Sequence, residues 1–245
     1  MQNSRIQEII ELIKKEVKPA LGCTEPIAVS LAVARSCEAL RDIDCSIDSI
    51  NVEVSANILK NGMGVGIPGT GMIGLHIASA LAATCGKSKY KLEVLKDLGA
   101  SSIDKAKKLV DDKKVSITLA DTSLKLYIKA NVTGTCKGIE HTASTVIKDN
   151  HDSIVSVELD GVSVFSTGNA EGAGICNISS AEKTTLDYKL SVKEILEFVR
   201  SVNINDIDFI LDSVKLNKAL ADEGLRADYG LKVGRTILSA EHNSI

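Results

Sequence analysis

Apolar residues near the N-terminus recur three or four positions apart, as they do on one face of an amphipathic helix. The pattern predicts a first helix that ends before Pro19 and a second helix from about Pro26 to Leu40. Between Lys91 and Val110 the same spacing predicts one or two further amphipathic helices. The apolar face of the first helix consists of Ile6, Ile9, Ile10, Ile13 and Val17.

Alternation of apolar and polar residues indicates the strands. The segment SIDSINVEVSA (residues 46–56) alternates with a period of two and is predicted to be a strand. Further alternating segments between Val115 and Gly168 are separated by turn residues, which predicts an antiparallel meander. Between these regions a glycine-rich segment (residues 57–74) leads into LHIASALAA, which is apolar nearly all round and is therefore expected to be a buried helix.

The chain returns to a helical pattern after a loop with the sequence GNAEGAGICNISS. Ser191 is expected to cap the next helix, with Glu194 as its partner in a capping box, and the last helix is expected from about Asp228 to Ala240. Helices, then a sheet, then helices predict an α+β fold in which helices flank a central antiparallel β-meander. Because no linker or internal repeat is visible, residues 1–245 are expected to form a single domain.

Composition and charge narrow the classes of function. With three Phe, four Tyr, no Trp and a net charge of −3, the chain has few aromatic residues to stack on bases and no polybasic patch, so we expect no nucleic-acid partner. No apolar run is long enough for a transmembrane helix, and the first helix carries charges throughout, so we expect neither a membrane partner nor a signal peptide. The sequence therefore predicts a cytoplasmic protein.

Six cysteines in a reducing compartment are not expected to form disulfides. Their spacing does not indicate a zinc site either, because no Cys-x-x-Cys and no Cys/His pair of the zinc type occurs. Cys37 continues the apolar face of a helix and Cys85 follows an alanine-rich helix, so both are interpreted as structural.

Cys23 differs, since it lies in the sequence GCTEP just before the second predicted helix. Thr24 is expected to cap that helix, and Pro26 suits its first turn. Free N–H groups and the positive end of the helix dipole would stabilise a thiolate and lower the pKa of Cys23, as a metal ligand or a nucleophile requires. A buried cysteine in a tight turn explains the same residues, and both interpretations stay open at this point.

Two other features carry candidate chemistry. The segment GTGMIG (residues 69–74) matches the G-x-G-x-x-G of dinucleotide-binding loops, but it does not directly follow a strand and no βαβ unit surrounds it. Close approach of its backbone to a ligand or to another segment is therefore favoured. His151 lies at the entry of a predicted strand, where a solvent-facing side chain and an acid–base group are the alternatives.

Several long motifs resemble the L-cysteine desulfidase family, which is related to the iron–sulfur L-serine dehydratase alpha chain. They are EVKPALGCTEPIAVSLA, ILKNGMGVGIPGTGMIGLHIASALAA, LEVLKD, FILDSVKLNKAL and GLRADYGLKVGRTI. The resemblance implies the N-terminal part of a longer iron–sulfur lyase, which converts L-cysteine to pyruvate, sulfide and ammonia, or L-serine to pyruvate and ammonia. It also implies a [4Fe–4S] cluster held by three cysteines, and no pyridoxal phosphate.

The resemblance assigns roles to particular residues. Cys23 is expected to be a cluster ligand and His151 an acid–base group, while Asn61, Thr70 and Asn217 are expected to contact the substrate. Glu25 is instead expected to cap the helix start.

The other two cluster cysteines would come from a C-terminal half or a companion subunit. The apolar face of the last helix would then be exposed, and self-association into a homo-oligomer is one way to cover it. A serine dehydratase subunit and a non-catalytic remnant that binds an amino acid remain alternatives.

Overall fold

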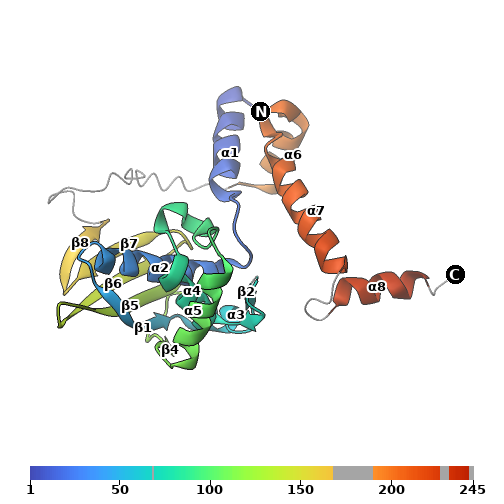
Figure 1. Ribbon diagram of the computed structural model, residues 1–245. Helices are drawn as coiled ribbons and strands as arrows, with labels where there is room; N and C mark the ends of the chain where they lie inside the picture. Colours follow the sequence, from blue (N-terminus) through green and yellow to red (C-terminus); the bar gives the residue numbers. More distant parts are fainter. Residues whose placement is uncertain (68, 168–189, 227–231, 243–245) are drawn as a thin grey trace. The chain divides into compact units, whose positions relative to one another are not determined.

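The computed structural model describes residues 1–67, 69–167, 190–226 and 232–242 (Figure 1). The chain divides into two compact units, one formed by Met1–Pro19 with Ala181–Ile245 and the other by Ala20–Ser180. The α+β class expected from the sequence is confirmed. The single-domain organisation stays a prediction.

A six-stranded mixed sheet organises the unit Ala20–Ser180, with the strand order β4-β1-β5-β6-β7-β8. Strands β5 to β8 form the expected antiparallel meander, and β1 pairs antiparallel with β5. Strand β4 is not part of the meander, because it lies at the sheet edge and pairs parallel with β1. The strands are β1 (Ser46–Val54), β4 (Val115–Leu119), β5 (Tyr127–Cys136), β6 (Ile139–Lys148), β7 (Ile154–Leu159) and β8 (Val162–Ser166).

Two predicted helices form the core against one face of this sheet. Helix α2 (Thr24–Arg41) contacts β1, β5, β6 and β7, and α4 (Leu75–Cys85) contacts α2, β1 and β4. Both helices are rich in alanine, which lets their backbones approach closely, and the expected burial of α4 is confirmed. Helix α5 (Ala100–Asp111) packs on α4. The opposite residues of β5, such as Lys129 and Asn131, stay partly exposed, as the alternation predicts.

The glycine-rich segment is more ordered than a loop. It contains a short helix, α3 (Ala56–Gly62), followed by strands β2 (Gly66–Ile67) and β3 (Met72–Ile73), which pair antiparallel. The G-x-G-x-x-G sequence therefore contains turn residues of a hairpin, strand β3 and Gly74, the N-cap residue of α4, whereas a pyrophosphate-binding loop runs directly from a strand into a helix. A 3₁₀ helix, η1 (Ser88–Glu93), follows α4.

The second unit is helical. Its elements are α1 (Asn3–Glu16), α6 (Val192–Ser201), η2 (Ile204–Ile207), α7 (Ile210–Arg226) and α8 (Val233–His242). Ile6, Ile9 and Ile10 of α1 are buried with Phe198 of α6, as the periodicity predicts for α1.

The predicted capping box at the start of α6 is confirmed. Ser191 Oγ accepts a hydrogen bond from the backbone N–H of Glu194, and the Glu194 carboxylate accepts one from the Ser191 N–H.

Helix α8 of the helical unit exposes the apolar side chains of Val233, Ile237 and Leu238. Within the described ranges, no helix combines the length and apolarity needed to cross a membrane.

Candidate functional site

Four residues singled out in the sequence lie near one another at one end of the sheet. Helix α2 begins there with Cys23 and Glu25, β1 ends there and leads into α3 with Asn61, and the turn between β6 and β7 brings His151. The strands order this arrangement, because β6 ends opposite the start of β5 and β1 ends beside it. We call Cys23, Glu25, Asn61 and His151 the Cys23 cluster.

Cys23 is the N-cap residue of α2, one position earlier than the predicted cap Thr24. Its backbone is extended, and its side chain makes no capping hydrogen bond. Gly22 precedes it with a φ of +98°, a left-handed conformation that disfavours other residues, and nothing lies within 4 Å of where a Cβ would be. The glycine therefore turns the chain, and the turn leaves Cys23 exposed.

Glu25 connects the cluster. The Cys23 Sγ donates a hydrogen bond to Glu25 Oε2 at 3.0 Å, and the Asn61 Nδ2 donates one to Glu25 Oε1 at 3.1 Å. Burial alone would raise the pKa of Glu25, but the hydrogen bonds from Cys23, from its own backbone N–H and from Asn61, together with the nearby charge of His151, lower it. Glu25 is therefore a carboxylate at neutral pH, and it binds two donors at once.

The prediction of a lowered pKa for Cys23 is wrong. Although the residue as a whole is exposed, partial removal of its sulfur from water raises the pKa of the thiol, and the hydrogen bond to Glu25 raises it further. The N–H groups of Thr24 and Glu25 act in the expected direction but are outweighed. Cys23 is thus a protonated thiol that donates to a carboxylate.

His151 is half-buried in the turn between β6 and β7. It lies close enough to Glu25 for its charge to favour the ionised carboxylate. This position is consistent with an acid–base group beside the cluster, and the catalytic role itself stays a prediction.

Thr70 and Asn217 do not join the cluster through any described contact. Thr70 is buried, and its Oγ1 donates to the carbonyl of Ile67 at 2.7 Å and accepts from the N–H of Met72 at 3.0 Å, so it holds the β2–β3 hairpin together. Asn217 lies exposed on α7 in the other unit, where its Nδ2 donates to the Ser213 carbonyl at 2.7 Å. Their roles in substrate binding stay predictions.

Glu25 is the residue of the cluster whose contacts the sequence analysis did not predict. It was expected to cap α2, yet its carboxylate binds side chains from two elements. The available signal was its position two residues after a cysteine at a helix start, but Asn61 is 36 positions away and its contact could not be predicted from local spacing.

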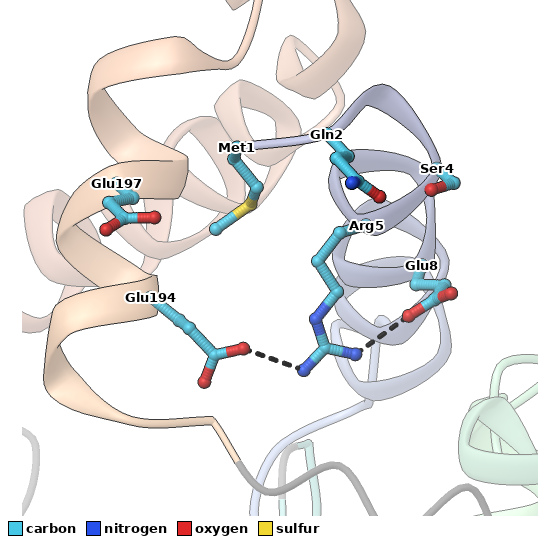
Figure 2. Close-up of a pocket in the computed structure, with 7 residues that line it drawn as sticks. All are labelled: Met1, Gln2, Ser4, Arg5, Glu8, Glu194 and Glu197. Carbon is cyan, nitrogen blue, oxygen red and sulfur yellow. Dashed lines mark hydrogen bonds and ion pairs between the residues drawn. The ribbon is translucent and has the colours of Figure 1, made fainter.

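A surface pocket lies elsewhere, within the helical unit, and contains none of the predicted site residues (Figure 2). Figure 2 shows Arg5 of α1 reaching toward two carboxylates, with 2.7 Å to Glu8 and 3.2 Å to Glu194. Because Arg5 is already paired with two carboxylates, its guanidinium is not available to an anionic ligand. We therefore give the Cys23 cluster precedence as the candidate site.

The described cysteines do not fit a cluster held by three thiolates of this chain. Among the described residues, no group of three or more His, Cys, Asp or Glu side chains is placed to hold a metal ion. Cys37 is fully buried, and burial raises its pKa to about 12, while Cys85 donates to the Leu81 carbonyl. Cys176 lies outside the described residues. Cys23 is thus available as one ligand, and at least part of a three-thiolate set would have to come from outside the described residues.

Comparison with known proteins finds relatives that carry the name UPF0597 protein. The chain is 39% identical over 246 residues to a UPF0597 protein of Bacteroides fragilis, and the match covers 100% of this chain and 54% of that protein. A UPF0597 protein of Oleidesulfovibrio alaskensis is 42% identical over 228 residues, with 93% of this chain and 50% of that protein covered. No family profile and no solved structure matches the chain.

These matches correct the resemblance inferred from the motifs. The relatives carry the name UPF0597 protein and none is named as an L-cysteine desulfidase or serine dehydratase, so the predicted membership of the desulfidase family is wrong. The chain spans about half the length of the curated relatives it matches. It is therefore similar, over nearly all of its own length, to one part of these UPF0597 proteins.

Proposed function

We propose that the Cys23 cluster binds a small amino acid and takes part in its β-elimination. For L-cysteine the balanced reaction with water gives pyruvate, sulfide and ammonia, and for L-serine it gives pyruvate and ammonia. The observation that supports this proposal is that a thiol and an amide both donate hydrogen bonds to the Glu25 carboxylate, with the His151 imidazole near enough to influence its charge. We place the reaction in the cytoplasm, as the sequence predicts.

The charges of the cluster suit a zwitterion. The ionised Glu25 would pair with the substrate ammonium, because a carboxylate held by two donors stays charged at neutral pH. The Asn61 amide, held in place by Glu25, would orient the substrate through its remaining donor and acceptor.

Elimination also needs proton transfer. A base must take the α-proton, and an acid must protonate the leaving sulfur or oxygen. His151 would exchange the proton, since an imidazole can act as either partner near neutral pH. The Cys23 thiol, which donates to Glu25, is a second group able to give a proton at the same place.

Further groups of the site would come from a C-terminal half or a companion subunit, since the chain spans about half the length of the curated relatives it matches. A [4Fe–4S] cluster completed by cysteines from outside this chain, with Cys23 as one ligand, stays a prediction. When bound, such a cluster would supply a Lewis acid for the leaving group.

Pyruvate release tests the proposal. The chain would be assayed anaerobically with L-cysteine and L-serine, alone and mixed with the unmatched part of the Bacteroides fragilis relative, with iron and sulfide supplied. We expect release that falls at least tenfold in Glu25→Gln and is unchanged in Glu140→Gln, an exposed carboxylate on β6. Release that is equal in both variants would refute the assignment of Glu25.

The second candidate function is binding without chemistry. It is favoured if L-serine binds the chain in a Glu25-dependent manner and no mixture releases pyruvate. The same assay on Cys23→Ala, with Cys85→Ala as the matched cysteine control, separates a role of the thiol in chemistry from a role in binding.

A further inference from the structure

A pair of cysteines, Cys45 and Cys136, lies at the opposite end of the sheet from the Cys23 cluster. Helix α2 separates the two places, because Cys23 precedes its first turn and Cys45 follows its last; its 18 residues span about 27 Å. The register pairs Ser46 of β1 with Thr135 of β5, so Cys45 and Cys136 are the next residues to face each other. Cys136 lies close enough to Cys45 to raise the pKa of the Cys45 thiol.

Gly134 makes room for this contact. A Cβ at that position would lie 2.3 Å from the Ser46 carbonyl oxygen and 3.3 Å from the Cβ of Cys45, so a larger residue would push the start of β1 away from β5. Residues that face each other in antiparallel strands have Cα atoms about 4.5–5.5 Å apart. Disulfides need about 4.4–6.8 Å, so the strand geometry already suits a bond between these cysteines.

The two thiols differ in access. Cys45 is 6% exposed, whereas Cys136 is half-buried, so a dissolved oxidant reaches Cys136 first. Burial raises the pKa of Cys45, and Cys136, Asp160 and Asp48 raise it further, so a smaller share of Cys45 is thiolate at neutral pH than of an ordinary cysteine. Cys136 is therefore suited to attack first and Cys45 to resolve the intermediate.

We propose that Cys45 and Cys136 are a reversible redox pair that is oxidised to an intramolecular disulfide by a low-molecular-weight disulfide such as oxidised glutathione. The Cys136 thiolate attacks one sulfur of glutathione disulfide, the sulfur–sulfur bond breaks, and one glutathione leaves and takes up a proton. Cys45 then loses its proton and attacks the Cys136 sulfur, which releases the second glutathione. Two protein thiols are oxidised and one glutathione disulfide is reduced to two thiols.

The bond would fasten the start of β1 to the end of β5. It closes a loop of roughly 90 residues, which restricts the unfolded chain, and we expect the midpoint of thermal unfolding to rise by about 10 °C. This inference does not rest on the proposed function, since neither cysteine belongs to the Cys23 cluster.

Equilibration in glutathione buffers tests the proposal. The full chain would be held at a series of reduced-to-oxidised glutathione ratios, alkylated, digested and mapped by mass spectrometry. We expect a peptide that joins Cys45 to Cys136, which disappears again as the ratio becomes reducing. Alkylation of both residues at every ratio, or a disulfide between either of them and another cysteine, would overturn the proposal.

Variants test the order of attack. In Cys45→Ser we expect Cys136 to be trapped as a mixed disulfide with glutathione, and in Cys136→Ser we expect Cys45 to stay reduced. Cys85→Ser is the matched control and should form the Cys45–Cys136 bond like the wild type. If either variant unfolds, judged by circular dichroism, the wild-type peptide map alone decides.

Discussion

A buried hydrogen-bond bridge between α2 and the sheet offers a quantitative test of the fold. Ser36 Oγ lies 3.1 Å from the carbonyl oxygen of Ala130 and 2.8 Å from Thr145 Oγ1, and both side chains are fully buried. Since a hydroxyl carries one proton, the Ser36 hydroxyl shares it between the Thr145 Oγ1 and the Ala130 carbonyl oxygen, both of which accept. The bridge joins α2 to the sheet, and the start of α2 holds Cys23 and Glu25 of the Cys23 cluster.

The losses of stability from replacing the two partners should not add. Ser36→Ala leaves the Thr145 hydroxyl buried without this partner, which we expect to lower the free energy of unfolding by about 1–3 kcal/mol. Thr145→Val removes only one acceptor of Ser36, which keeps the Ala130 carbonyl, and should cost about 0.5–1.5 kcal/mol. In the double variant no hydroxyl is left unpaired, so its loss should be smaller than the sum of the two single losses by about 1–2 kcal/mol.

Urea unfolding followed by circular dichroism measures these differences. Ser101→Ala, at an exposed position on α5, is the control and should stay within about 0.5 kcal/mol of the wild type. Additive losses in the double variant would refute the inferred bridge, because they would mean that the two hydroxyls do not interact.

Two further predictions concern titratable groups. Glu25→Gln removes the negative acceptor that helps to raise the pKa of Cys23, so the alkylation rate of Cys23, followed peptide by peptide, should rise at a lower pH than in the wild type; an unchanged pH profile would contradict this. The hydrogen bond from His141 and the N–H of Thr142 lower the pKa of Asp160 below its unfolded value of about 3.9. Its stabilising effect is therefore complete above that value and lost as the pH falls through the folded pKa. The difference in melting temperature between wild type and Asp160→Asn should shrink between about pH 5 and pH 2, and a constant difference would count against the interaction.

Elements with a strong local pattern could be predicted from the sequence. The isoleucines of α1, the period-two residues of β1 and the Ser191 cap are local signals, and each element forms where it was expected. Strand β4 was expected beside β5 because the two are consecutive, yet β1 lies between them. Pairing between β1 and β4 joins residues about 65 positions apart, as in Ile50 and Val115, and no local spacing encodes it.

The candidate site divides in the same way. Cys23 could be selected because a cysteine in a turn before a helix is unusual, and its exposure is confirmed. Its protonation could not be predicted, because partial removal of the sulfur from water and the hydrogen bond to Glu25 oppose the helix dipole, and both depend on the tertiary structure. The cysteine pair was missed because Cys45 and Cys136 become neighbours only through the β1–β5 register.

Calorimetric titration of L-serine onto the chain tests most directly whether the Cys23 cluster is an amino-acid site. L-serine avoids the thiol exchange that L-cysteine would bring. The account predicts binding to the wild type and to Glu140→Gln, with affinity at least tenfold weaker in Glu25→Gln, because the carboxylate that pairs with the ammonium is lost. Equal affinity in all three proteins, or no binding to the wild type, would contradict it.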